Sequence, residues 1–226
     1  MGLFGPSRQE RQAAAAAAVA PYGFRLVPPE NERLKMQLAP FALHSSPDRC
    51  RATAFGKIDD ADVYALDYDY SYRDADGNDQ TSSQMIVAVY HPRIAGGAAF
   101  MPDMKHWSGV AAALDMMLWV PPFTFVKAFQ LFLEAKNPDR VVGHAEFDRL
   151  YVVRAASDAD AARAISPKLR ETVVRLAFRG TVELRESLLL YSVQGCSFDG
   201  EGLLTALRYA APLTLAAMTD AGAAYR

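Results

Sequence analysis

Residues 62–90, DVYALDYDYSYRDADGNDQTSSQMIVAVY, decide the fold because apolar and polar side chains alternate through the first half of the stretch. The even positions carry Tyr64, Leu66, Tyr68, Tyr70 and Tyr72. The odd positions carry Val63, Ala65, Asp67, Asp69, Ser71 and Arg73. A period of two over this length predicts a long β-strand, with one aromatic face and one face that is mostly in contact with solvent.

The second half of the stretch predicts the returning strand of a hairpin over 81–90, where β-branched and aromatic residues are frequent. The aspartates between the two strands also invite comparison with a calcium-binding EF-hand loop. With Gly77 at the sixth position of such a loop, the first and twelfth ligand positions fall on Tyr72 and Ser83, which are not acidic. Asp, Asn and Gly are typical of tight turns, so we interpret the segment as a hairpin turn and predict no metal site.

Two carboxylates and a guanidinium group share one face of the predicted strand: Asp67, Asp69 and Arg73. Acids two positions apart lie roughly 6.6–6.8 Å apart along a strand, a spacing that suits a metal- or phosphate-handling site or an acid/base pair. The three residues lie within the strand rather than at its end, and a charged, solvated face also discourages edge pairing. We therefore predict a polar face here and keep an enzyme with an acidic site on the Asp67/Asp69 strand as the alternative.

The remaining chain predicts an α+β fold, in which an antiparallel sheet of several strands packs with helices. Further strands are expected at 50–58 and 97–102, and a second hairpin turns at 186–187. Further helices are expected over 105–119, from Ser157, from Ser166 to about residue 178, and from Asp199 with a kink at Pro212. We expect a single domain over 23–226, preceded by a polar, Ala-rich tail or short helix over 1–22.

The composition indicates an ordinary globular protein, with 226 residues, 51% hydrophobic residues and a formal net charge of −2. Basic residues are scattered among acids, which disfavours nucleic acid as a partner. Cys50 and Cys196 form no CxxC pair, as is common in a reducing compartment. The most apolar stretch, 109–135, is interrupted by Asp115 and Pro121, so no transmembrane segment is predicted and the protein is expected to be soluble and cytoplasmic.

No pattern in the sequence predicts catalysis. The four histidines show no metal-ligand spacing, and nucleophile-elbow, phosphate-loop and dinucleotide-binding motifs are absent from the sequence. We therefore predict no catalytic residue, no metal ligand and no cofactor.

An interaction surface is predicted at Met116, Trp119 and Phe123. Met116 and Trp119 lie opposite the apolar face of the predicted 105–119 helix, and methionines and aromatics outside a core face suit an adaptable contact surface. The alternative is that another part of the fold covers them.

The sequence around EFDRLYVVRAASDADAARAISPKLRETVVRL, residues 146–176, resembles a widespread bacterial family of hypothetical, often membrane-anchored proteins of unknown function. The resemblance covers roughly residues 53–193. Its pattern includes Gly56 before the tyrosine-rich hairpin, Phe100-Met101-Pro102, Phe147-Asp148, Tyr151-Val152, Ala162-Arg163, Ser166-Pro167 with Leu169, and a hairpin from Glu183 to Leu190. The chain departs from the family in lacking transmembrane helices and in carrying Ser187 where a glycine is expected. The resemblance implies a shared fold and no defined activity.

We therefore expect a non-catalytic protein- or ligand-binding or scaffolding module. Its partner would be another bacterial protein or a small apolar ligand held between sheet and helices. Besides the enzyme alternative above, peripheral membrane association through Trp119 and Phe123 is a third interpretation.

Overall fold

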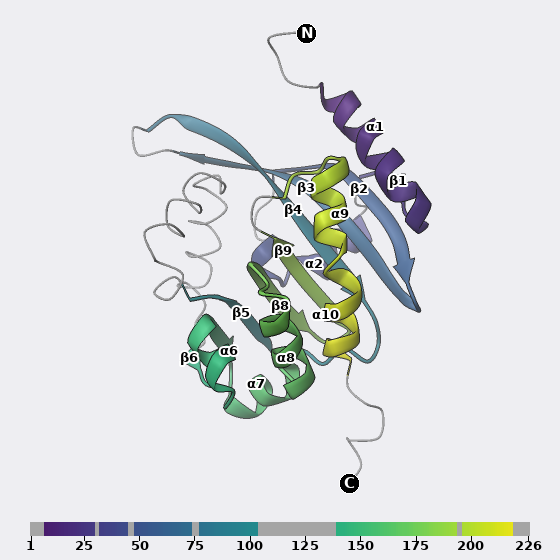
Figure 1. The fold of residues 1–226 in the computed structure, drawn as a ribbon. Coiled ribbons are helices and arrows are strands. Elements are labelled where there is room, and N and C mark those ends of the chain that lie inside the picture. Colours follow the sequence, from purple (N-terminus) through teal and green to yellow (C-terminus); the bar gives the residue numbers. More distant parts are fainter. Residues whose placement is uncertain are drawn as a thin grey trace.

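A nine-stranded sheet organises the part of the chain that the structure describes (Figure 1). The computed structural model describes residues 7–29, 32–44, 48–73, 77–103, 139–193 and 196–218. The strands are β1 (Arg25–Val27), β2 (Arg49–Ile58), β3 (Ala61–Arg73), β4 (Asp79–Tyr90), β5 (Ala98–Pro102), β6 (Asp139–Arg140), β7 (Tyr151–Ala155), β8 (Gly180–Arg185) and β9 (Leu188–Val193). The helices are α1 (Arg8–Val19), η1 (Ala20–Tyr22), α2 (Glu32–Leu38), η2 (Ala42–His44), α6 (Ala145–Leu150), α7 (Asp158–Ala164), α8 (Pro167–Arg175), α9 (Gly200–Leu207) and α10 (Ala210–Ala217).

The strands pair in the order β1-β2-β3-β4-β9-β8-β5-β7-β6, and every pair is antiparallel. The β8–β9 hairpin therefore lies between β4 and β5, which are consecutive in the sequence. This arrangement confirms the predicted α+β class, with an antiparallel sheet packed against helices in one domain-like fold. Both predicted hairpins, β3–β4 and β8–β9, are present.

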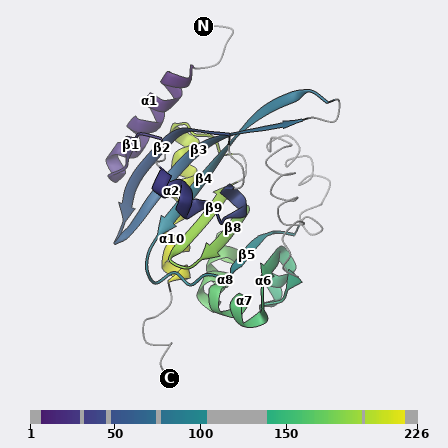
Figure 2. The ribbon, with the colours of Figure 1, turned by 180° about the vertical axis from the view of Figure 1, so that it is seen from behind.

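Helices cover both faces of the sheet. Figure 1 shows α1, α9, α10 and α8 on one face, and Figure 2, from behind, shows α2 on the other. The larger core cluster lies under the first group of helices and includes Val63, Ala65 and Val87. The smaller cluster lies under α2 and η2 and includes Tyr68 and Tyr70.

The prediction of one solvated face along β3 was wrong for the first half of the strand. Val63 and Ala65 are fully buried, because the helices over the odd positions leave no solvent above them. The even positions behave as predicted, since Leu66, Tyr68 and Tyr70 are buried in the smaller cluster. Only at the far end of the strand, from Ser71, do side chains become exposed.

The N-terminal helix α1 begins at a capping box and ends before Pro21. The Ser7 hydroxyl accepts from the Glu10 N–H, and the Glu10 carboxylate accepts from the Ser7 N–H. Val19 is fully buried, and a Cβ on Gly200 of α9 would lie 3.3 Å from the Ala14 carbonyl oxygen. The helix is thus packed closely against α9.

Two helix boundaries differ from the prediction. The helix that begins at Ser166 ends at Arg175 rather than near 178, because Ala177 takes a left-handed conformation with φ 44°. The Phe178 N–H then donates to the Val173 carbonyl at 3.2 Å, which closes the helix end in a Schellman-type motif. The C-terminal helix breaks into α9 and α10 instead of bending at Pro212, since a proline ring clashes with the carbonyl four residues earlier, here that of Arg208.

Among the described residues, none of the helices combines the length and apolar character needed to cross a bilayer. Neither Cys50 nor Cys196 forms a disulfide bond within the described residues.

Candidate functional site

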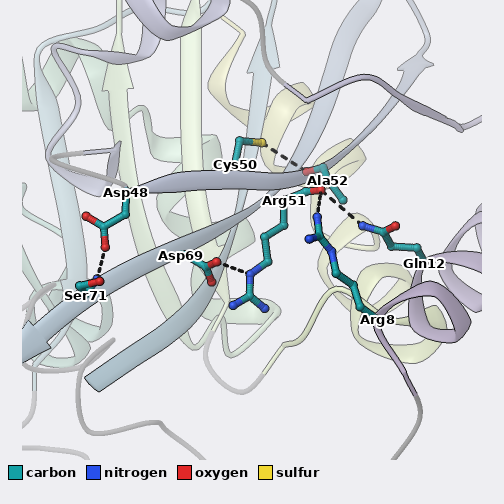
Figure 3. Close-up of polar contacts among 8 residues, drawn as sticks. All are labelled: Arg8, Gln12, Asp48, Cys50, Arg51, Ala52, Asp69 and Ser71. Atoms are coloured by element: carbon teal, nitrogen blue, oxygen red, sulfur yellow. Dashed lines mark hydrogen bonds and ion pairs between the residues drawn. The ribbon is translucent and has the colours of Figure 1, made fainter. Parts of the chain in front are cut away.

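β2 carries one extra residue, Arg51, where it faces β3. Cys50 and Ala52 pair with consecutive residues of β3, so Arg51 lies between two successive pairs. Such a β-bulge redirects the side chain and the carbonyl of the extra residue. The Arg51 guanidinium Nε donates to Oδ2 of Asp69, and its carbonyl turns toward α1 (Figure 3).

Side chains of α1 bind the Arg51 carbonyl. Nη2 of Arg8 donates to this oxygen at 2.7 Å, and Nε2 of Gln12 donates to it at 3.3 Å (Figure 3). β1 pairs with β2 only over Thr53–Phe55, so the Arg51 carbonyl lies beyond the reach of the neighbouring strand. The two α1 side chains thus satisfy a polar group that would otherwise stand open at a sheet edge.

Asp69 is held by the bulge at Arg51 and by Asp48, directly before β2. Its side chain is 14% exposed and that of Arg51 is 26% exposed. The Asp48 N–H donates to the Asp69 carbonyl at 2.9 Å, and the Asp48 carboxylate accepts from the N–H of Ser71 (Figure 3). Oδ1 of Asp69 is buried and has no hydrogen-bond partner within the described ranges.

Asp67 lies beside this ion pair in a poorly solvated position. Burial raises the pKa of its carboxyl group to about 6, from an ordinary value of 3.8. The positive charge of Arg51 acts against this rise, and the negative charge of Asp69 adds to it. Asp67 therefore takes up a proton close to neutral pH.

The chemistry open to this cluster is proton binding and ion pairing. Arg51 is the cation beside both carboxylates, and it forms an ion pair with Asp69. Throughout the residues that the structure describes, no group of three or more His, Cys, Asp and Glu side chains is arranged to hold a metal ion.

Arg73, the third member of the predicted polar face, is not part of this cluster. Its Nε lies 3.2 Å from Oδ1 of Asp79 across the hairpin, and the two side chains are 71% and 82% exposed. The structure therefore brings Asp67 and Asp69 together with Arg51, not with Arg73. The predicted interaction surface at Met116, Trp119 and Phe123 lies outside the described residues.

The three histidines in the described ranges have structural partners. His44 Nε2 lies 3.0 Å from the Tyr68 hydroxyl, and His144 Nδ1 accepts from the Phe147 N–H at 3.1 Å to begin α6. Nδ1 of His91 accepts from the Arg93 N–H at 3.1 Å, so its Nε2–H faces Oδ2 of Asp60 at 3.1 Å.

A buried acid on β8, Glu183, was not predicted from the sequence. It is 7% exposed, and its Oε1 accepts from the Ala42 N–H at 3.1 Å, while Oε2 has no hydrogen-bond partner within the described ranges. Burial raises the pKa of this carboxyl group to about 7, and the N–H groups of Leu43 and Ala42 and the charge of Arg185 act against the rise. Its position in the alternating run 181–193 pointed to a strand but not to burial beneath η2.

A half-open cavity of about 510 Å³ lies between the β4–β5 loop and the β8–β9 turn. Its wall is formed by the β4–β5 loop, by the β8–β9 turn and by one side chain of α7. The lining residues are Pro92, Arg93, Ile94, Ala95, Gly96, Gly97, Arg163, Arg185, Glu186 and Ser187.

Backbone hydrogen bonds hold the two loops of this cavity together. The His91 N–H donates to the Ser187 carbonyl at 3.0 Å, and the Ser187 N–H donates to the Ile94 carbonyl at 3.0 Å. The Gly97 N–H donates to the Leu184 carbonyl at 2.9 Å. A Cβ on Gly96 would stand 2.2 Å from the backbone of Arg185, so the close approach of the loops requires glycine there. The cavity is thus built into the backbone.

Sequence reasoning did not find this cavity. The available signal was the Gly96-Gly97 pair directly after Pro92 and Arg93, since adjacent glycines mark a close approach of backbones. The partner of that approach, the 186–187 turn, is about ninety residues later in the sequence, so no local pattern links the two.

Comparison with known proteins yields a fold and no family. The chain matches no protein-family model, and no curated protein matches its sequence. Its fold is similar to that in the crystal structure of the mycobacterial trehalose monomycolate transport factor A, TtfA, with a TM-score of 0.52 over 92% of this chain and 97% of the TtfA chain. The sequence identity is 10%, so the likeness concerns the fold alone.

Proposed function

We propose that the protein is a non-catalytic binding module that holds a small ligand in the cavity between the β4–β5 loop and the β8–β9 turn. The observation that carries this proposal is the cavity itself, about 510 Å³ in volume and bounded by loops that are hydrogen-bonded to each other. Small-molecule sites commonly measure about 300–1,000 Å³ and are largely formed before the ligand arrives.

The lining favours binding over catalysis. The hydroxyl group in the lining belongs to Ser187, and a serine nucleophile needs a general base beside it. The candidate base is His91, whose backbone N–H donates to the Ser187 carbonyl. However, its ring Nδ1 accepts from the Arg93 N–H and its Nε2 faces Asp60. Neither ring nitrogen is therefore left to take the proton of Ser187.

The fold comparison supports the same proposal. TtfA is named a transport factor, and a fold shared with such a protein is compatible with a role in binding. The enzyme alternative draws on Asp67, whose pKa of about 6 suits proton transfer. Its neighbour Asp69 is occupied by Arg51, and side chains of α1 hold the bulge, which favours a structural role for the acidic pair.

A cavity-filling variant tests the proposal. Ala95 lines the cavity, and Ala95→Phe is expected to fill it; Ala13→Phe, at an exposed position of α1, is the matched control. Protein purified from its host is analysed by native mass spectrometry, and the purified variants are screened by thermal shift against neutral, cationic and anionic metabolites. A ligand that wild type and Ala13→Phe retain and Ala95→Phe loses supports the proposal. Absence of any ligand from wild type in both measurements, or equal binding by Ala95→Phe, overturns it.

A further inference from the structure

The edge of β2 beyond β1 is covered by a helix rather than by a strand. β1 pairs with β2 over residues 53–55 of β2, and the two residues that follow β1 are Pro28 and Pro29. Because proline has no N–H to donate to a neighbouring strand, this pair stops β1 from extending further along β2. Residues 49–52 of β2 therefore have no strand on this side among the described strands.

The first half of α1, residues 7–12, contacts this edge through polar side chains. Nη2 of Arg8 and Nε2 of Gln12 both donate to the Arg51 carbonyl oxygen, at 2.7 Å and 3.3 Å (Figure 3). The six residues include no apolar side chain, and all of them are exposed except Gln12, which is half-buried. Burial of apolar surface therefore does not hold this half of the helix in place.

The second half of α1 is held differently. Ala15 and Val19 are fully buried in the larger core cluster. A Cβ on Gly200 would lie 3.3 Å from the Ala14 carbonyl oxygen, so α9 packs directly on this half. Segments with few buried apolar contacts open at a lower free energy than the core does, so the first half of α1 is the part that can open by itself.

Charge adds to the attraction between the first half of α1 and β3. The acidic pair Asp67/Asp69 outweighs Arg51 by one negative charge when both acids are ionised, and residues 7–12, with two arginines and one glutamate, carry one net positive charge. Burial raises the pKa of Asp67, and the positive charges of Arg8 and Arg11 act against that rise. The two arginines of the helix thus favour the ionised acid beneath them.

We propose that residues 7–12 of α1 form a strap, which opens and closes over residues 49–52 of β2 while the rest of α1 stays packed on α9. The bulge residue Arg51 holds the strap through its carbonyl, and its own guanidinium is held by Asp69. Opening leaves this part of β2 without its cover, and an uncovered strand edge is where another strand can pair. The strap thus controls access to one edge of the sheet, and the proposal does not depend on the cavity.

Native-state hydrogen exchange of the full chain, followed by NMR, tests the proposal with the double variant Arg8→Ala/Gln12→Ala. The amides of residues 11–13 report on the strap. They are expected to exchange at least tenfold faster than in wild type, because the variant loses both hydrogen bonds to the Arg51 carbonyl. The amides of Val19 and Val63 are expected to keep their rates, since both residues lie in the packed core.

Ordinary fraying of a helix end predicts a different result. Alanine is a better helix former than arginine or glutamine, and loss of a positive charge from the first turn improves the interaction with the helix dipole. If the contacts with β2 did not hold the strap, the double variant would therefore exchange at the wild-type rate or more slowly. Gln9→Ala, at an exposed position of the same turn, is the matched control.

The Ala52 amide shows whether the strap acts on β2. This amide belongs to the same peptide group as the Arg51 carbonyl, so its chemical shift depends on the hydrogen bonds that the carbonyl accepts. Its signal is expected to move in the double variant and to stay in place in Gln9→Ala. Strap amides that exchange no faster than in Gln9→Ala, an acceleration that extends equally to Val19 and Val63, or an unmoved Ala52 signal would each overturn the proposal.

Discussion

Replacing Asp67 by Asn is expected to stabilise the protein at neutral pH. Burial raises the pKa of this carboxyl group from 3.8 to about 6, so the folded protein binds the proton more tightly than the unfolded chain does. Above pH 6 the ionised group is therefore a destabilising feature of the fold. Asparagine has nearly the shape of the protonated acid and carries no charge.

The size of the effect follows from the two pKa values. Because a tenfold change in proton affinity corresponds to about 1.4 kcal/mol, the interval from 3.8 to about 6 corresponds to at most about 3 kcal/mol. We expect Asp67→Asn to be more stable than wild type by about 1–3 kcal/mol at pH 7.5. The advantage shrinks as the pH falls through 6 and disappears below about pH 3, where Asp67 is protonated in both states.

The assay is urea denaturation followed by far-ultraviolet circular dichroism at several pH values. The control is Asp79→Asn, at a side chain that is 82% exposed, which is expected to change stability by less than about 0.5 kcal/mol. If attraction to Arg51 outweighs burial, Asp67→Asn will be less stable than wild type and its deficit will grow with pH. That result would refute the reasoning.

Three further changes test other parts of the structure. Glu183→Gln is expected to be more stable than wild type by about 1–3 kcal/mol at pH 8.5, since burial raises the pKa of Glu183 from 4.5 to about 7. Urea denaturation should show this advantage shrinking as the pH falls through 7 and vanishing below about pH 4; a difference that is constant with pH would contradict it. Phe147→Ala should lower the free energy of unfolding by about 3–5 kcal/mol in the same assay, because the ring is fully buried and stacks on Tyr151 with centroids 4.9 Å apart. A loss below about 1 kcal/mol would show that the core tolerates the space left by the ring. Ser187→Gly should raise the free energy of unfolding by about 0.5–1 kcal/mol relative to Ser187→Ala, because φ is 65° at this position, and equal melting temperatures of the two variants would argue against strain there.

The strands were predictable because their patterns are local. The alternation from Tyr64 to Tyr72 and the run 81–90 defined the β3–β4 hairpin, and each residue needed only its sequence neighbours to be interpreted. The helix starts at Ser157 and Ser166 were predictable for the same reason, since each hydroxyl accepts from an N–H three residues later.

What the sequence did not predict depends on distant residues. The burial of Val63 requires helices from both ends of the chain, and the strand pattern alone shows only that one side is less aromatic. The early end of α8 depends on Ala177 in a left-handed conformation, which usually marks glycine. The family resemblance led us to expect glycine at position 187, where Ser187 has φ 65°, a conformation that favours glycine.

The candidate site was only partly predictable. Asp67 and Asp69 were singled out by their spacing, and they do lie together. Arg51 was missed because an extra residue in a strand leaves no mark in the alternation of β2. The cavity was missed because its lining comes from the β4–β5 loop, α7 and the β8–β9 turn, which only the topology of the sheet brings together.

On the ribosome, the strands of this sheet emerge in a different order from that in which they pair. β1 to β4 can form a meander as soon as they leave the exit tunnel, but the neighbour of β4 is β9, which ends at Val193. Until then, the edge of β4 over Val87–Tyr90 has no partner from its own chain among the described strands. Helix α1 likewise meets α9 only after residue 207 has been made. Completion of the fold therefore waits for the last third of the polypeptide, and premature termination would leave an apolar strand edge open to association with other chains.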